Sequence, residues 1–241
     1  MKNYLNILIF TFLFIGINQA QQIDETFFNE VNSFLEKNVK NGLVDYRQAS
    51  TDESLMLLIQ KIQKVDLSSA SDNTKKAFYI NAYNLYVINL VSYYYPTKSP
   101  MDISGFFDNK RIKVAGQELT LNQLEKSKLL KPYKDPRFHF VLVCGAMGCP
   151  PITNFAYTPG NLEAQLDQQT RKATNDPSFI KVNNNKVELS QIFKWYIDDF
   201  GGNKDASIEF INNYRKAPLS SSADIGYYQY DWALNDVVKK K

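Results

Sequence analysis

The most reactive side chains of the chain lie in one short window, RFHFVLVCGAMGCPP at residues 137–151. The window holds the only histidine, His139, and both cysteines, Cys144 and Cys149. A thiolate beside an imidazole can attack an amide or ester carbonyl, because the imidazole takes the thiol proton and later returns it to the leaving group. Since the chain has one histidine, any imidazole-dependent mechanism must use His139.

The spacing within the window distinguishes the two cysteines. The apolar run 138–144 predicts a central strand, in which alternation places His139 and Cys144 on opposite faces. Cys149 follows a loop with two glycines, which can fold back toward His139. Pro150 comes next and is typical of a turn or helix cap, where local amides favour a thiolate. The window therefore indicates Cys149 as the nucleophile and His139 as the base.

The same residues allow structural interpretations. Two cysteines five residues apart can close a disulfide in an oxidising compartment, which would silence both thiols. His139 can equally be a core histidine that donates to a backbone carbonyl. The sequence leaves these alternatives open.

Metal and nucleotide chemistry have less support. A zinc site needs three or four convergent ligands, so a carboxylate would have to join, and no spacing singles one out. The candidates are Asp45, Asp198, Asp199 and Asp231; Asp198 and Asp199 are expected to be solvated or to cap a helix. The chain has no G-x-G-x-x-G, Walker or G-x-S-x-G motif. We expect no metal and no other cofactor.

The N-terminus predicts export. Lys2 precedes the apolar run 5–17, which is too short to span a bilayer, and Ala20 is a small residue at the expected cleavage position. We expect residues 1–20 to be a signal peptide rather than an uncleaved anchor, with no stable membrane insertion of the mature protein. Residues 21–241 then form one domain in the periplasm or medium. The net charge of +3 favours neither nucleic acid nor an anionic membrane as a partner.

Hydrophobic periodicity predicts the elements around the window. The expected helices cover residues 24–37, 53–65, 121–130, 161–174, 190–197 and 205–214, and a long helix runs from a cap at Ser71 or Asp72 to a stop at Pro96. Hairpins are expected at residues 111–120 and 179–189, and the tail 225–230 can add a strand. Helices and hairpins without regular alternation predict an α+β fold, a single domain with helices packed on a small, mainly antiparallel sheet.

The long helix carries two polar residues on an apolar face, Asn81 and Asn84. Apolar residues occupy its other faces too, so we expect it to be buried nearly all round. Either asparagine is a candidate for the amide that orients His139 or stabilises an oxyanion.

Three segments of the chain resemble the DUF547 family of uncharacterised domains: FYINAYNLYVINLVSYYYP (78–96), HFVLVCGAMGCPPI (139–152) and LSQIFKWYIDDF (189–200). The segments GLVDY (42–46) and LEAQLD (162–167) fit the same pattern. The resemblance implies a shared site formed by Asn81, Tyr83, Asn84, His139, Cys144, Cys149 and Pro150. Family members often have serine or another small residue before the second cysteine; the glycine here, Gly148, puts a hydroxyl role in doubt.

The resemblance supplies no activity, but its implied layout is similar to that of papain-like thiol hydrolases. Our leading hypothesis is a thiol-dependent hydrolase or transferase that acts on an amide or ester. Cys149 is the nucleophile and His139 the base, Asn84 or Asn81 is the supporting amide, and Cys144 is a structural or resolving thiol. The alternative is a non-catalytic module stapled by a Cys144–Cys149 disulfide, whose aromatic surface binds glycan or peptide. Thiol–disulfide exchange is a third alternative, without the usual C-x-x-C spacing.

Overall fold

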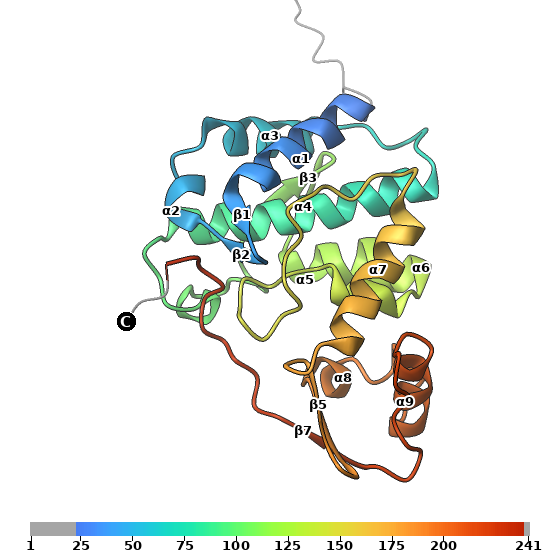
Figure 1. Ribbon diagram of the computed structural model, residues 1–241. Helices are drawn as coiled ribbons and strands as arrows, with labels where there is room; N and C mark the ends of the chain where they lie inside the picture. Colours follow the sequence, from blue (N-terminus) through green and yellow to red (C-terminus); the bar gives the residue numbers. More distant parts are fainter. Residues whose placement is uncertain (1–22, 239–241) are drawn as a thin grey trace, which may run out of the picture.

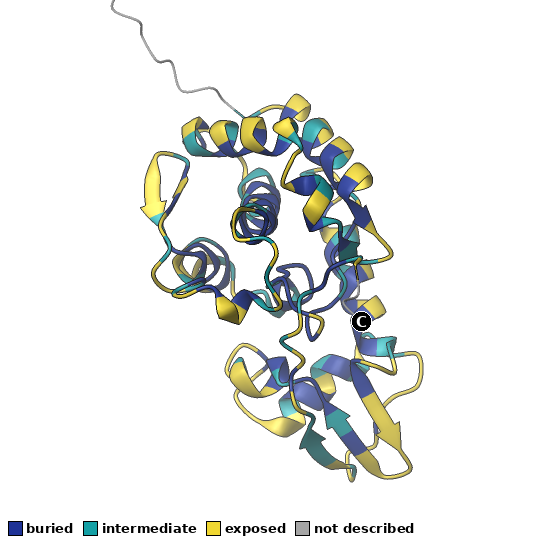
Figure 2. Ribbon diagram, turned by 90° about the vertical axis from the view of Figure 1, so that its left-hand side faces the viewer, coloured by how far each residue is buried: buried dark blue, intermediate teal, exposed yellow. Residues whose placement is uncertain are grey.

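A buried helix lies at the centre of the fold. The structure is a computed structural model that describes residues 23–238, so the expected signal peptide lies outside the described residues. Helix α4 (Asp72–Tyr93) begins at Ser71, whose side chain accepts a hydrogen bond from the Thr74 backbone N–H. Figure 2 looks along α4 and shows it buried on nearly every side. Its burial and its N-cap both agree with the sequence prediction.

Shorter helices surround α4, with α1, α2 and α3 in one layer and α5 and α6 in another (Figure 1). The helices are α1 (Glu25–Asn38), α2 (Tyr46–Ala49), α3 (Glu53–Lys64), α5 (Leu121–Leu124), α6 (Lys131–Tyr133), α7 (Leu162–Asn175), α8 (Ile192–Trp195) and α9 (Lys204–Asn212). Between α5 and α6 the helix widens into a π-helical turn, Glu125–Leu130, and 3-10 turns cover Pro100–Asp102 and Pro136–Phe140.

The strands form three separate small sheets. Strands β1 (Val39–Lys40) and β2 (Leu43–Val44) make one hairpin, and β3 (Ile112–Val114) and β4 (Gln117–Leu119) make another. The third sheet contains β5 (Ile180–Asn183), β6 (Lys186–Leu189) and β7 (Asp224–Tyr227). β5 pairs antiparallel with β6, and β7 pairs parallel with β6. The fold is α+β, as the sequence predicts, but its central element is α4 rather than a sheet.

The predicted strand at 138–144 is wrong. Residues Pro136–Phe140 form a 3-10 turn, which begins where the Asp135 carboxylate accepts the Arg137 backbone N–H. The following residues are irregular, and two of their backbone groups pair with the Asn84 side chain rather than with a neighbouring strand. Asn84 donates to the Val141 carbonyl at 2.9 Å and accepts the Val143 N–H at 2.9 Å. The run is apolar because it is buried against α4, not because it lies in a sheet.

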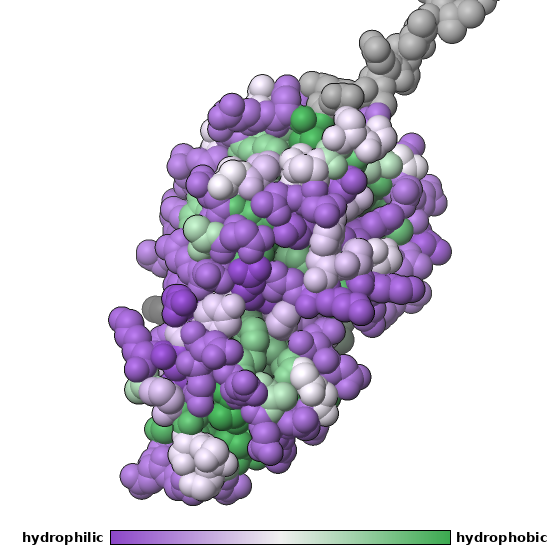
Figure 3. All heavy atoms as spheres, turned by 90° about the vertical axis from the view of Figure 1, so that its right-hand side faces the viewer, coloured by the Kyte–Doolittle hydropathy of each residue, from purple (hydrophilic) through white to green (hydrophobic). Residues whose placement is uncertain are grey.

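The surface of the described residues is mostly polar. Hydrophilic residues cover most of the face in Figure 3, with smaller hydrophobic patches between them. Within residues 23–238, no helix combines the length and hydrophobicity needed to cross a bilayer.

Replacing Asn84 by alanine should destabilise the protein by roughly 2–4 kcal/mol, because two buried backbone groups lose their partner. Asn29→Ala is the matched control, since Asn29 is exposed on α1 and should change stability by no more than about 0.5 kcal/mol. Urea unfolding of the two variants measures both values. Equal stabilities would show that Asn84 does not hold the 141–143 segment.

Candidate functional site

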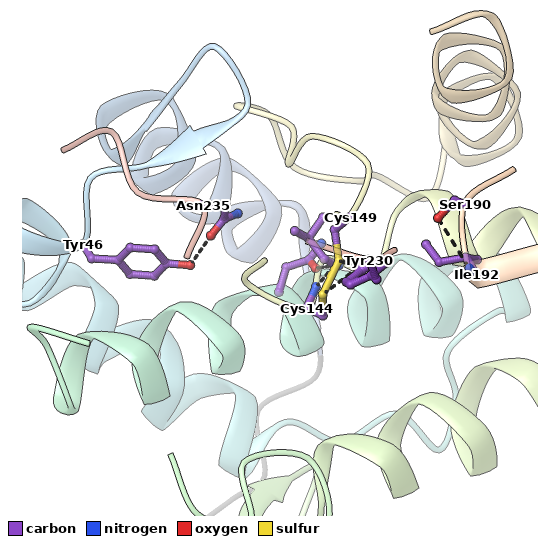
Figure 4. Close-up of a disulfide and its surroundings, with 9 residues drawn as sticks. Tyr46, Cys144, Cys149, Ser190, Ile192, Tyr230 and Asn235 are labelled. Carbon is purple, nitrogen blue, oxygen red and sulfur yellow. Dashed lines mark hydrogen bonds between the residues drawn. A yellow bond between two sulfur atoms is a disulfide. The ribbon is translucent and has the colours of Figure 1, made fainter. Parts of the chain in front are cut away.

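The two cysteines of the window form a disulfide. The Cα atoms of Cys144 and Cys149 are 6.4 Å apart, and the bond closes the loop 144–149 beside α4 (Figure 4). Cys149 is 9% exposed and Cys144 is half-buried. In this state neither sulfur is a thiol, so the chemistry of the site depends on whether the bond is made or reduced.

The C-terminal tail holds the disulfide loop in place. The Met147 N–H donates to the Ala233 carbonyl at 2.8 Å, and the Gly148 N–H donates to the Asp231 carbonyl at 2.8 Å. The tail is itself anchored to the N-terminal layer, because the buried Tyr46 hydroxyl donates to the Asn235 side-chain oxygen at 2.7 Å (Figure 4). Residues far apart in the sequence therefore fix one short loop.

Tyr230 contacts both sulfurs. Its hydroxyl donates to Cys149 Sγ at 3.0 Å and lies 3.2 Å from Cys144 Sγ. The Tyr230 ring also explains the residue before the second cysteine, because a Cβ on Gly148 would lie 2.8 Å from ring carbons. A side chain at position 148 would therefore force the Tyr230 ring to shift.

The only histidine has a carboxylate partner. His139 is 4% exposed, and its Nε2 lies 2.8 Å from Asp199 Oδ2. Its ring packs on the ring of Tyr196, with 4.0 Å between centroids, and beside Phe200 at 5.4 Å. Aromatic packing and the carboxylate together fix the orientation of the imidazole, as in sites where histidine transfers protons.

A buried acid lies close to this pair. Glu125, the first residue of the π-helical turn, is 5% exposed. Burial raises the pKa of its carboxyl, while the charge of His139 and a hydrogen bond from Tyr196 act in the opposite direction. π-Helical turns occur frequently at functional sites.

One cavity connects these groups. Its volume is about 230 Å³, and Glu125, His139, Cys144, Cys149 and Tyr83 are among its lining residues. Its wall also includes five further aromatic rings, those of Phe107, Trp195, Tyr196, Tyr230 and Trp232. The cavity thus combines a disulfide, an oriented imidazole and a buried carboxyl.

The structure gives the asparagines of α4 a different role from the predicted one. Asn81 donates to the Tyr157 carbonyl at 2.7 Å and accepts the Tyr157 N–H at 3.1 Å. Asn84 is occupied in the same way by the backbone of Val141 and Val143. Both amides therefore hold backbone segments against α4, and Asp199 takes the position beside His139 that was expected for an asparagine.

The expectations for Pro150 and for a papain-like layout also change. Pro150 is buried and lines a second cavity of about 480 Å³, and Cys149 lines both cavities. The papain-like arrangement is not observed, because both sulfurs and His139 lie in irregular or 3-10 segments against a helix. Within residues 23–238, no three His, Cys, Asp or Glu side chains converge as a metal site requires.

Several site residues were not identified from the sequence. Glu125 had a usable signal, because it lies four residues after Leu121 and four before Leu129, on the apolar side of its helix. The sequence indicates Asp199 only as a metal ligand or as a helix cap. Tyr230 and Trp232 gave no signal, since their position depends on how the tail returns to the loop.

Glu125→Gln should change the pH dependence of stability. The raised pKa of Glu125 means that the folded state holds this proton more tightly than the unfolded state does. The wild type is therefore most stabilised at low pH, and it loses this stability as the pH rises from the ordinary glutamate pKa through the raised one. Glutamine does not titrate, so the stability of the variant relative to that of the wild type should increase as the pH rises above about 4. Melting temperatures of the variant and the wild type at a series of pH values measure this difference in stability. The exposed Glu118→Gln is the matched control. A gap that does not vary with pH would contradict this account.

Comparison with known proteins gives one family match. Residues 67–172 match the family model described as "Protein of unknown function, DUF547". The matched region contains α4, Glu125, His139 and both cysteines. No curated protein and no solved structure shows significant similarity to the chain. Residues 67–172 of this chain belong to the DUF547 family.

Proposed function

We propose that this protein is a thiol-dependent hydrolase or transferase that acts on an amide or ester through Cys149, His139 and Asp199. The observation that carries the proposal is that Cys149 and His139 line the same cavity, and that His139 is hydrogen-bonded to Asp199. The disulfide form is then the inactive form, and reduction by an external dithiol yields the two thiols.

The surroundings of Cys149 favour it over Cys144 as the nucleophile. Its sulfur receives two hydrogen bonds, from the Cys144 backbone N–H at 3.0 Å and from the Tyr230 hydroxyl at 3.0 Å. Donors directed at a sulfur stabilise the thiolate that forms when the disulfide is reduced. Cys144 then serves as the resolving thiol that closes the bond again.

The histidine is oriented for proton transfer. Asp199 binds Nε2 of His139, so proton transfer falls to Nδ1. An acidic partner fixes the tautomer and stabilises the imidazolium that forms during the reaction. Such a partner is the third member that a thiol–imidazole pair requires.

The proposed steps conserve protons and electrons. The Cys149 thiol gives its proton to His139, and its sulfur forms a bond to the carbonyl carbon of the substrate. His139 returns the proton to the leaving amine or alcohol as the old bond breaks, which leaves a thioester. Water, or an acceptor amine or alcohol in a transferase, then gives its proton to His139 and bonds to the carbonyl carbon as the thioester C–S bond breaks, and His139 returns the proton to the Cys149 sulfur.

Cys144→Ala tests the proposal, because it leaves Cys149 as the only cysteine and free without a reductant. With an activated ester such as p-nitrophenyl acetate, we expect turnover by this variant with or without dithiothreitol. The wild type should turn over only after reduction, and Cys149→Ala should not turn over at all. Asp199→Asn in the Cys144→Ala background should lower the rate by about 10²- to 10⁴-fold.

The rival proposal is a non-catalytic glycan- or peptide-binding module. It is favoured by the disulfide itself, which leaves neither cysteine free, and by the exposed ring of Trp195 at the cavity. If Cys144→Ala and Cys149→Ala show the same ester turnover, with and without dithiothreitol, the thiol mechanism fails and the binding module takes its place.

We also propose that the chain is exported, on the strength of its N-terminal sequence and of a disulfide, which persists in oxidising compartments. Protein recovered from the periplasm or medium of the producing cell should begin at about Gln21, as read by N-terminal sequencing. Protein that starts at Met1 and stays in the cytoplasm would contradict export.

A further inference from the structure

The cavity beside the disulfide is acidic and aromatic. Among the described residues that line it, Asp108 and Glu125 are carboxylates, and none is lysine or arginine. The electrostatic field in such a cavity favours a cationic occupant and opposes an anionic one.

Glu125 is the residue of the cavity that most favours a cation, because its carboxyl is buried. With 5% exposure, its charged form loses most of its hydration, and no lysine or arginine of residues 23–238 forms an ion pair with it. The nearby base, His139, already hydrogen-bonds Asp199. The Glu125 carboxyl has a hydrogen bond from Tyr196 and the charge of His139 nearby but no lysine or arginine partner, so a cationic ligand would stabilise its ionised form.

The aromatic wall suits the same ligand. Trp195, Tyr230 and Trp232 form a cluster whose ring centroids are 4.7–6.0 Å apart. The face of an aromatic ring attracts cations, and several rings around one acid are the usual way in which proteins bind organic ammonium groups. Trp195 is 47% exposed, so the cluster reaches from the cavity to the solvent.

We propose that this cavity binds an organic ammonium group, held between the Glu125 carboxylate and the Trp195–Tyr230–Trp232 cluster. The inference extends the proposed function by naming the class of substrate, an amide or ester whose acyl or leaving part carries a positively charged amine. Because both sulfurs and His139 line the same cavity, the bound ammonium group would place the adjoining bond near the reacting atoms.

The composition of the chain offers a direct probe. Its only two tryptophans, Trp195 and Trp232, both line this cavity, so intrinsic tryptophan fluorescence reports on this site alone. The disulfide-bonded wild type is titrated at constant ionic strength with n-butylammonium and tetramethylammonium chlorides, with n-butanol as the neutral isostere, and with N-acetylglucosamine. We expect a saturable fluorescence change with the two cations, and affinity for n-butanol lower by at least about tenfold.

Glu125→Gln should weaken cation binding by at least about tenfold, whereas the exposed Glu118→Gln on β4 should leave it unchanged. Equal affinity for n-butanol, tighter binding of the sugar, no saturable response to either cation, or unchanged binding by Glu125→Gln would overturn the inference. If Glu125→Gln does not fold, the comparison of cation and alcohol on the wild type decides. The assay uses the oxidised protein, in which thiol chemistry cannot operate, so its failure is distinguishable from failure of the thiol mechanism.

Discussion

The rest of the structure depends on one kind of interaction. Two asparagine side chains of α4 pair with the backbone of two non-helical segments. Asn81 and Asn84 each offer one donor and one acceptor to a passing chain, as a neighbouring strand would. Buried backbone groups need such partners, because leaving them unpaired costs more than most packing contacts contribute. A helix buried on nearly every side can therefore have irregular segments packed directly against it, and the segment held by Asn84 leads straight into the disulfide loop.

The site follows from that constraint together with the return of the tail. The 3-10 turn before residue 141 sets His139, and the loop after residue 143 sets the disulfide. The tail then adds Tyr230 and Trp232 and closes the loop through backbone hydrogen bonds. Glu125 and Asp199 come from two other parts of the chain, so the polar groups at the site are drawn from several elements. This dependence explains why the reactive residues are adjacent in sequence and yet require most of the domain to become a site.

Much of the fold could be predicted from sequence because most elements show their own periodicity and punctuation. α4 has its Ser71 cap, and β5 and β6 flank an asparagine turn, so both were placed within a few residues. The prediction failed at 138–144, where burial comes from tertiary packing against α4 and an apolar run cannot show whether its backbone partner is a strand or an asparagine. His139, Cys144 and Cys149 line one cavity, whereas the positions of Asp199, Glu125 and Tyr230 depend on contacts between distant segments, which no local pattern shows. A local pattern indicates which residues are reactive but not which groups act on them.

The central claim is that Cys149 is an activated thiol whose reactivity depends on His139. The most direct test is the pH dependence of iodoacetamide alkylation of Cys144→Ala, which has a single cysteine, compared with the same variant carrying His139→Ala. An ordinary cysteine thiol shows its inflection at about pH 8.5. We expect an inflection well below that value for Cys144→Ala and a shift back toward it when His139 is removed. An ordinary inflection in both proteins would contradict it.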